Sequence, residues 1–390
     1  GQANISSIDY LFTQFRVIVT YIRLLFLPIN QNLDYDYPVY SSFLEPAVFL
    51  SFIFLLSIFG LGVYLFKASN RNHGLRLISF GIFWFFINLS ITSSIIPVVD
   101  VIFEHRVYLS SAGIFIGVAT AIFMVSERVA WMKRIVKLAF ALIVVVASIA
   151  GFIRNDVWGS KESLWKDVIT KSPDKARGYN NLGLYYIDKG SHDIAIEYFK
   201  TAFRLKPDFI EPVNNLGNIY KEKGMIDKAI EYYQMALNIR KDNVVTLNNL
   251  GVALAERGQI DKGIEYLENA LKINPFMITT LFNLGIAYRE KGDMERSIEY
   301  FQNILKIDPK STEAHLNLGR IYGQKGMIDK EKEHYQAVLL LEPDFAERHF
   351  KIGASYGSKG LIDKEIEHYN IAIMVKPDFV VAYNNLGSAY

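Results

Sequence analysis

Asparagine recurs at a spacing of 34 residues through the C-terminal half of the chain. The first asparagine column consists of Asn181, Asn215, Asn249, Asn283, Asn317 and Asn385, with Lys351 interrupting it. A primary amide offers donors and an acceptor together, so it can bond the N–H and C=O groups of an extended polypeptide whatever its side chains. The column therefore predicts a peptide-binding ladder. The alternative is that the amides satisfy neighbouring helix ends, which is favoured for a second column at Asn180, Asn214, Asn248 and Asn384.

Two carboxylates, Asp34 and Asp36, stand close together in the segment Asp-Tyr-Asp-Tyr-Pro. A pair of this kind could serve acid–base catalysis or hold a metal ion, and it is the only catalytic candidate. Turn formation before Pro38 is the alternative, and the composition favours it.

A polar cluster of Glu104, His105 and Arg106 lies directly before an apolar run. The arginine fork suits a phosphate, so we expect a phosphate contact at the membrane surface, the alternative being a Glu104–Arg106 salt bridge. The chain has no cysteine, and its 7 histidines lack zinc-ligand spacing, so no metal site is expected. The net charge of +2 gives no indication of a nucleic-acid partner.

The elements that carry the asparagines are indicated by glycines at the same spacing: Gly183, Gly217, Gly251, Gly285, Gly319, Gly353 and Gly387. A period of 34 residues is typical of the tetratricopeptide repeat, in which helix A and helix B pack together. We expect the glycines to allow close helix approach, and we expect prolines such as Pro309 to end helix B. The sequence predicts six repeats over residues 176–379 and a truncated seventh over residues 380–390. Helix A lines the concave face, so the first asparagine column is expected in the groove.

Upstream, residues 154–175 predict a capping half-repeat helix, with Trp165 and Pro173 at helix B positions. Only Arg154 and Asn155 separate this helix from the last apolar run. We therefore expect the groove to be held in a fixed orientation relative to the membrane. Because the chain starts without methionine and stops inside a repeat, we interpret it as a fragment of a longer protein.

Four apolar runs predict four transmembrane helices over residues 47–153. They are Ala47–Phe66, Leu77–Val98, Tyr108–Val125 and Val136–Ile153. Residues 1–46 are expected to form an extracytoplasmic segment with an interfacial helix at about residues 15–29, since Arg16 and Arg23 disfavour a span. Lysine and arginine gather in the loops after the first and third spans, which places those loops in the cytoplasm and the repeats outside it. The predicted fold is all-α, a multi-span transmembrane helical domain followed by a tetratricopeptide-repeat α-solenoid.

Three stretches resemble one known family: Tyr21–Pro28, Glu104–Leu109, and Arg154–Trp158 leading to Trp165 and Pro173. They are similar to bacterial and archaeal relatives of the transmembrane-and-tetratricopeptide-repeat protein O-mannosyltransferases, in the GT-C glycosyltransferase superfamily. The resemblance implies a protein of the bacterial or archaeal cell membrane that transfers a sugar from a polyprenyl-phosphate carrier to Ser or Thr of proteins. The repeats would bind the polypeptide acceptor, and the asparagine column is similar to that of the soluble O-GlcNAc transferase.

The family's catalytic carboxylate lies in the first outward loop, and this chain is expected to begin after it. The resemblance therefore supplies no catalytic base here and leaves open whether this fragment is an enzyme. Arg106 is the best match to a carrier-phosphate contact, with His105 and Glu104 as neighbours. The lipid-linked sugar is the donor substrate, and no cofactor is identified.

Two other functions remain open. The chain could be a non-enzymatic, membrane-anchored scaffold for protein–protein interaction, or a component of lipid or polysaccharide transport. Several spans with polar outward loops favour chemistry at the membrane surface, whereas a simple anchor needs one span.

Overall fold

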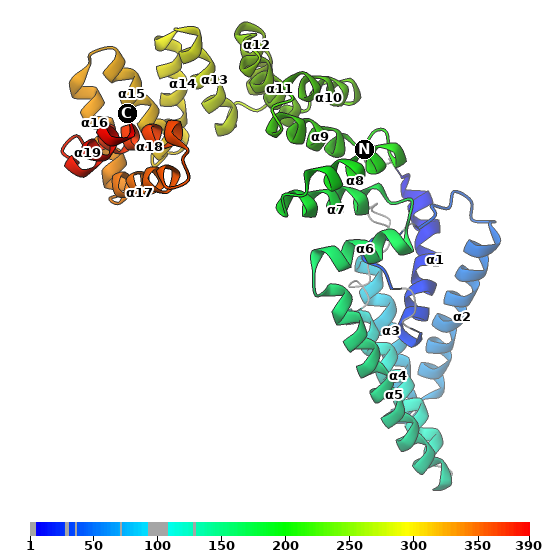
Figure 1. Cartoon of the computed structure of the whole chain (residues 1–390). Helices are drawn as coiled ribbons and strands as arrows, with labels where there is room; N and C mark the ends of the chain where they lie inside the picture. Colours follow the sequence, from blue (N-terminus) through cyan, green and yellow to red (C-terminus); the bar gives the residue numbers. More distant parts are fainter. Residues whose placement is uncertain (1–4, 28–30, 36, 71, 93–107, 128–129) are drawn as a thin grey trace. The chain divides into compact units, whose positions relative to one another are not determined.

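The computed structural model describes residues 5–27, 31–35, 37–70, 72–92, 108–127 and 130–390. Every regular element in these ranges is a helix and none is a strand, so the predicted all-α fold is confirmed (Figure 1). The chain divides into two units, residues 1–212 and residues 213–390, and each is described by itself.

The first unit begins with apolar helices, drawn from blue to cyan in Figure 1. They are α1 (Ser7–Phe26), α2 (Pro46–Ala68), α3 (His73–Thr92) and α4 (Tyr108–Ser126). Within the described ranges, three stretches are long and apolar enough to cross a membrane: Pro46–Ala68, His73–Ser90 and Leu109–Ser126. Side chains such as Leu56 and Phe123 face outward, as in helices that contact lipid.

Small residues let α3 and α4 pack closely. A Cβ added to Gly81 would lie 2.2 Å from the carbonyl oxygen of Gly113. The indole Nε1 of Trp84 donates a hydrogen bond to the carbonyl of Leu109 at 2.9 Å. Close backbone approach at glycine and an interhelical hydrogen bond are the usual means by which membrane helices associate.

Helix α1 starts before the predicted interfacial helix at residues 15–29. Ser6 caps its N-terminus, because the Ser6 hydroxyl accepts a hydrogen bond from the Asp9 backbone N–H at 3.1 Å. Tyr21 is buried against Phe85 of α3. The polar first turn interrupts the apolar run, which is why the sequence pattern alone placed the start too late.

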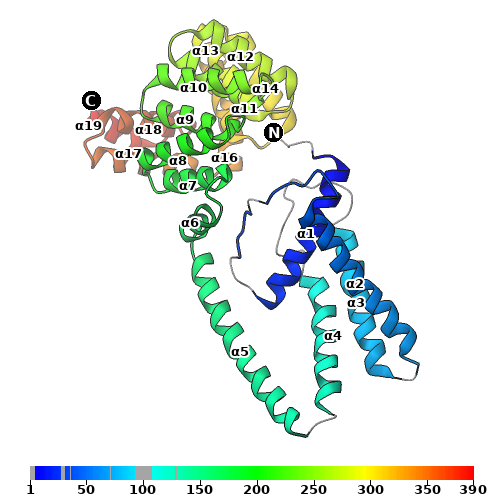
Figure 2. The same ribbon diagram turned by 90° about the vertical axis from the view of Figure 1, so that its right-hand side faces the viewer.

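Helix α5 (Ala130–Trp158) contains the predicted fourth span, Val136–Ile153, and continues beyond it. The predicted capping helix at residues 154–175 is therefore shorter than expected, and α6 occupies Lys161–Lys171 (Figure 2). The break lies at Gly159 and Ser160, where the Ser160 hydroxyl accepts from the Ser163 backbone N–H at 3.0 Å and caps α6.

The rest of the chain consists of successive helix pairs, each with a first helix (A) and a second helix (B). The A helices are α7 (Ala176–Asp188), α9 (Ile210–Glu222), α11 (Val244–Glu256), α13 (Ile278–Lys291), α15 (Thr312–Gln324), α17 (Phe345–Gly357) and α19 (Val380–Ala389). The B helices are α8 (His192–Leu205), α10 (Ile226–Ile239), α12 (Ile260–Ile273), α14 (Met294–Ile307), α16 (Ile328–Leu341) and α18 (Ile362–Val375).

The expected close approach at the periodic glycines is present. A Cβ added to Gly319 of α15 would lie 2.4 Å from Cε1 of Tyr335 on α16. Pro309 follows α14, which ends at Ile307, as the proline pattern predicts. A second glycine column lies in the turns between helix A and helix B; Gly292, for example, ends α13 with φ +87°.

Candidate functional site

Members of the two asparagine columns bond from one A helix to the next. The amide Nδ2 of Asn249 (α11) donates to Oδ1 of Asn218 (α9) at 3.1 Å. The amide Nδ2 of Asn283 (α13) donates to Oδ1 of Asn248 (α11) at 2.9 Å. Asn248 in turn donates to Oδ1 of Asn249 at 3.3 Å. The amides thus link three successive A helices into one hydrogen-bonded series.

The second column is mostly buried, at Asn180, Asn214 and Asn248. Asn214 Nδ2 donates to the Thr246 hydroxyl at 2.7 Å, and the Thr280 hydroxyl donates to Asn248 Oδ1 at 3.2 Å. Both bonds join successive A helices, so the geometry of this column supports the structural alternative.

The first column keeps bonding capacity for a ligand. A primary amide has two N–H groups and two acceptor lone pairs, and Asn249 uses one of each in the bonds above. Asn181, Asn215, Asn249 and Asn283 are half-buried. Asn317 is buried and Asn385 donates to the Tyr369 hydroxyl at 3.3 Å. Peptide binding by this column stays a prediction.

Asp34 is buried in an ion pair within the first unit. Its carboxylate lies 2.7 Å from Nε of Arg177 and 3.6 Å from Nζ of Lys175, both near the start of α7. The Asp34 backbone N–H donates to Oδ1 of Asn32 at 3.3 Å. Because two cations neutralise the carboxylate, its surroundings are those of a structural ion pair and do not favour proton abstraction.

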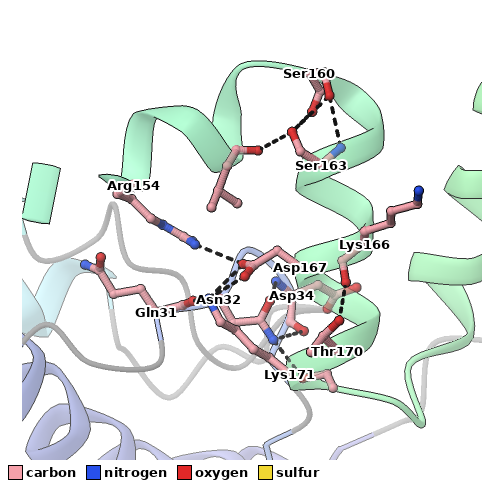
Figure 3. A network of polar contacts seen from close by, with 12 residues as sticks. Gln31, Asn32, Asp34, Arg154, Ser160, Ser163, Lys166, Asp167, Thr170 and Lys171 are labelled. Carbon is pink, nitrogen blue, oxygen red and sulfur yellow. Dashed lines mark hydrogen bonds and ion pairs between the residues drawn. The ribbon is translucent and has the colours of Figure 1, made fainter. Parts of the chain in front are cut away.

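The same segment is held by a wider polar network, shown in Figure 3. Asn32 Nδ2 donates to the Ser172 hydroxyl at 2.8 Å, and Lys171 Nζ donates to the Gln31 carbonyl at 2.7 Å. Asp167 of α6 pairs with both Lys171 and Arg154, at 2.7 Å and 2.9 Å. The network therefore fixes residues 31–34, between α1 and α2, against α5, α6 and the start of α7.

Helix α6 is also joined to α7 by Glu162. The Glu162 carboxylate accepts hydrogen bonds from Lys166, Tyr186 and Tyr185. These three donors, Lys166 first, lower the pKa of Glu162 to about 2. The carboxylate stays charged at neutral pH, and α6 packs on α7 as the predicted half-repeat requires.

The remaining predicted site residues lie outside the described part of the chain. They are Asp36 and the cluster Glu104, His105 and Arg106. Their proposed roles in catalysis and in phosphate binding stay predictions.

Models of the tetratricopeptide repeat match four parts of the helical array: residues 176–209, 217–258, 242–310 and 312–345. These helix pairs are tetratricopeptide repeats. The pairs beginning at α7, α9, α11, α13, α15 and α17 are numbered here as repeats one to six. The family models reach residue 345, and α17, α18 and α19 continue the same pattern of helices. No curated protein matches the chain by sequence.

Many solved structures resemble the array. One is MamA from Desulfovibrio magneticus, with 25% identity over 44% of this chain and 97% of that chain, at a TM-score of 0.41. Another is YrrB, described as a tetratricopeptide-repeat protein with an unusual peptide-binding site, with 20% identity over 49% and 98% of the two chains and a TM-score of 0.36. A third is PilF of Pseudomonas aeruginosa, with 17% identity over 56% and 99% and a TM-score of 0.43.

Sequence reasoning missed two histidine pairs in repeats five and six. Nδ1 of His315 lies 2.9 Å from Nδ1 of His334, and Nδ1 of His349 lies 3.0 Å from Nδ1 of His368. Burial first, and then the partner imidazole, lower the pKa of His334 and of His349. The pairs recur at the repeat period of 34 residues, and this recurrence is the signal in the sequence that indicates them.

The same two repeats carry glutamate where the others have a small residue in helix B. Glu331 and Glu365 stand where the earlier repeats have Ala195, Ala229, Gly263 and Ser297. In the structure, each carboxylate lies beside a glycine of helix A. A Cβ on Gly323 would come 2.6 Å from Oε1 of Glu331, and Gly357 stands in the same relation to Glu365. The missing side chain on helix A makes room for the larger one on helix B.

Proposed function

We propose that the repeats bind an extended segment of a partner protein beside a membrane in which the N-terminal helices are embedded. The observation that carries this proposal is the pair of first-column amides of Asn249 on α11 and Asn283 on α13, which are half-buried and keep N–H groups and lone pairs for a polypeptide backbone. Solenoids of this kind use such extended surfaces to bind partners.

The test is binding of an unstructured Ser/Thr-rich peptide to the full chain in detergent, followed by fluorescence anisotropy. Replacing Asn249 and Asn283 by alanine should weaken binding roughly tenfold, since two backbone hydrogen bonds are lost. The matched control replaces Asn269 and Asn303, which lie on B helices and accept from Lys272 and Lys306. Equal losses in both double variants would contradict a role for the first asparagine column.

The proposed sidedness places the repeats outside the cytoplasm, on the side opposite the lysine- and arginine-rich loops. The natural absence of cysteine makes this measurable with single-cysteine variants. In intact cells, a membrane-impermeant maleimide should label Lys189→Cys, between α7 and α8, and should not label Ala68→Cys at the end of α2. The reverse pattern would invert the proposed topology.

A finer function is transfer of a sugar from a polyprenyl-phosphate carrier to Ser or Thr hydroxyls of the bound segment. It rests on the family resemblance and on the network that fixes residues 31–34, between α1 and α2, against α6 and the start of α7, the first helix of the repeats. In the reaction the hydroxyl oxygen would bond to the sugar's anomeric carbon and pass its proton to a general base. The bond from that carbon to the carrier phosphate would break with its electron pair on the phosphate, which Arg106 would stabilise.

The transfer is tested with the natural protein in membranes, a radiolabelled polyprenyl-phosphate sugar and the same peptide. Label should reach the peptide and should be lost with Arg106→Ala, while Arg76→Ala, in the first turn of α3 and on the proposed cytoplasmic side, should retain activity. Peptide binding without transfer from any sugar donor would leave a membrane-anchored scaffold as the function.

A further inference from the structure

Helix α1 carries two arginines alongside three of the membrane helices. Phe15 packs against Phe52 of α2 with ring centroids 5.2 Å apart, and Phe26 packs against Phe115 of α4 at 6.4 Å. Tyr21 is buried against α3. The helix thus contacts each of the three helices that contain a stretch long and apolar enough to cross a membrane.

These three contacts lie toward the same end of the membrane helices. Phe52 and Phe115 belong to the first halves of α2 and α4, and Phe85, the partner of Tyr21, belongs to the second half of α3. Because successive spans cross a membrane in opposite directions, these halves lie on one side of it. Figure 1 shows α1 beside the corresponding parts of α2 and α3. The arginines of α1 therefore belong to the leaflet on that side.

Arg16 and Arg23 lie on one side of α1, with Thr20 between them, because residues at i, i+4 and i+7 share a helix face. The Thr20 hydroxyl lies 2.8 Å from the hydroxyl of Tyr37, in the segment before α2. Burial raises the pKa of Tyr37, whereas the Thr20 hydrogen bond and then the charges of Arg16 and Arg23 lower it. Both positive charges therefore act on one phenol beside this face of α1.

Neither arginine has an anionic partner in the part of the chain that the structure describes. No described carboxylate lies within 4.0 Å of either guanidinium group; Arg16 is half-buried and Arg23 is exposed. Arg76, at the opposite end of the same membrane helices, is held instead, because its Nη2 donates to the Asn70 carbonyl at 2.7 Å. A charged side chain beside the apolar part of a membrane is costly and calls for a partner.

We propose that Arg16 and Arg23 bind the phosphate of an anionic phospholipid of the bilayer. A guanidinium fork matches the oxygens of a phosphate, and basic residues beside membrane helices attract anionic head groups. The occupant is a lipid because apolar side chains adjoin the cations: Phe26 and Leu27 are 51% and 58% exposed and offer a surface to acyl chains. This inference is independent of the proposed peptide binding and sugar transfer.

The test is lipid binding to the full chain in a neutral detergent, followed by native mass spectrometry. Phosphatidylglycerol should bind the wild type more tightly than phosphatidylcholine, whose choline group balances the phosphate charge. Arg16→Gln and Arg23→Gln should each weaken phosphatidylglycerol binding roughly fivefold and leave phosphatidylcholine binding unchanged, because each removes one cation at the head group. Equal affinity of the two lipids for the wild type would overturn the site.

The matched control is Arg76→Gln, which removes the same charge from an arginine that the Asn70 carbonyl already holds. It should leave the affinity for phosphatidylglycerol unchanged. A loss as large as that of Arg16→Gln would assign the effect to the net charge of the protein and would contradict a site on α1.

Two competitors identify the source of the phosphate. Inorganic phosphate should displace phosphatidylglycerol only at far higher concentration than a second phospholipid does, because it has no acyl chains. Displacement by a polyprenyl phosphate at lower concentration than by phosphatidylglycerol would assign the arginines to the sugar carrier and would overturn the proposal. Displacement by inorganic phosphate as readily as by lipid would overturn it too, in favour of a free anion.

A melting experiment covers the case in which a glutamine variant folds poorly. Phosphatidylglycerol should raise the melting temperature of the wild type more than phosphatidylcholine does, because a ligand that binds only the folded state stabilises it. The double variant Arg16→Lys and Arg23→Lys, which keeps both charges, should retain most of this shift. The same shift in the glutamine variants as in the wild type would overturn the site and leave peptide binding by the repeats untouched.

Discussion

Repeats two and four differ from repeats five and six in the rings that lie between their helices. In repeat four, Tyr288 stacks on Tyr300 with ring centroids 5.5 Å apart and planes at 12°. In repeat five, Tyr322 stacks on His334 with centroids 5.5 Å apart and planes at 5°. Repeat two follows the tyrosine pattern and repeat six the histidine pattern. One ring position therefore accepts either residue without a change in geometry.

A basic side chain covers the shared tyrosine in both kinds of repeat. Arg296 lies 5.1 Å from the ring centroid of Tyr288, and Lys330 lies 5.0 Å from that of Tyr322. The cation–π contact and the stack form the common scaffold. The comparison teaches that the scaffold tolerates exchange of a tyrosine, with an ordinary pKa of about 10, for a histidine, with an ordinary pKa of about 6.5. We therefore predict that repeats five and six are sensitive to pH without a change of fold.

The largest expected effect tests whether the scaffolds are equivalent. Phe301 in repeat four and Tyr335 in repeat five are buried under the periodic glycines. Phe301→Ala should reduce the local free energy of opening by about 3–5 kcal/mol, and Tyr335→Ala by a similar amount, because each leaves a cavity. Hydrogen exchange of the backbone amides in the full chain measures both. A much smaller loss in one variant would show that the two repeats are not built alike.

The next largest effect concerns the contact between Gly323 and Glu331 in repeat five. Gly323→Ala should cost about 1 kcal/mol, because the new methyl group displaces the Glu331 carboxylate from its place. The double variant with Glu331→Ala should recover this loss, since repeat three already pairs Ala255 with Gly263. Hydrogen exchange over α15 and α16 measures the coupling between the two changes. Strictly additive losses would mean that the two residues do not share the space.

The repeat fold could be predicted from the sequence because the same residue types, above all glycine and asparagine, recur at equivalent positions of successive repeats. The ends of the membrane-proximal helices could not. An apolar run stops at the first charge, Arg154, whereas backbone hydrogen bonding in α5 continues until Gly159 and Ser160. A helix boundary follows capping and not hydrophobicity, and the same reason explains the early start of α1.

For the candidate site, the sequence placed the asparagines on helix A but could not supply their partners. The bond from Asn283 to Asn248 depends on the offset between successive A helices, which a one-dimensional period does not contain. Asp34 is a stronger case, because its partner Arg177 lies 143 residues further along the chain. Only the packing of the segment before α2 on α7 brings the two together.

The histidine pairs predict a pH dependence confined to repeats five and six. In the folded protein the pKa of His334 and of His349 is lowered, so the folded state binds fewer protons than the unfolded state just below the ordinary histidine pKa of about 6.5. Their contribution to stability is therefore complete above that pKa and is lost as the pH falls below it. A lower melting temperature is expected at pH 5 than at pH 8, by a few degrees.

Converting repeat five to the pattern of repeat four provides the control. The double variant His315→Leu and His334→Tyr should remove the acid sensitivity of α15 and α16 and leave that of α17 and α18, which hold His349 and His368. Hydrogen exchange at the two pH values, corrected for the intrinsic rate, resolves the repeats. Acid sensitivity that persists in α15 and α16 would assign it to groups other than the histidines.

The smallest expected effect concerns the exposed ion pairs, which do not follow the division between the two kinds of repeat. Arg257 with Asp227 links repeats two and three, and Lys325 with Glu295 links repeats four and five, through the same pair of positions. Arg257→Gln and Lys325→Gln should each reduce stability by less than about 1 kcal/mol, and less still in high salt, because solvent screens exposed charges. Melting temperatures at low and high salt measure both variants. A larger loss of stability for Lys325→Gln than for Arg257→Gln would mean that repeat five differs in its charged side chains as well as in its stacked rings. The difference between the two kinds of repeat would then be electrostatic as well as aromatic.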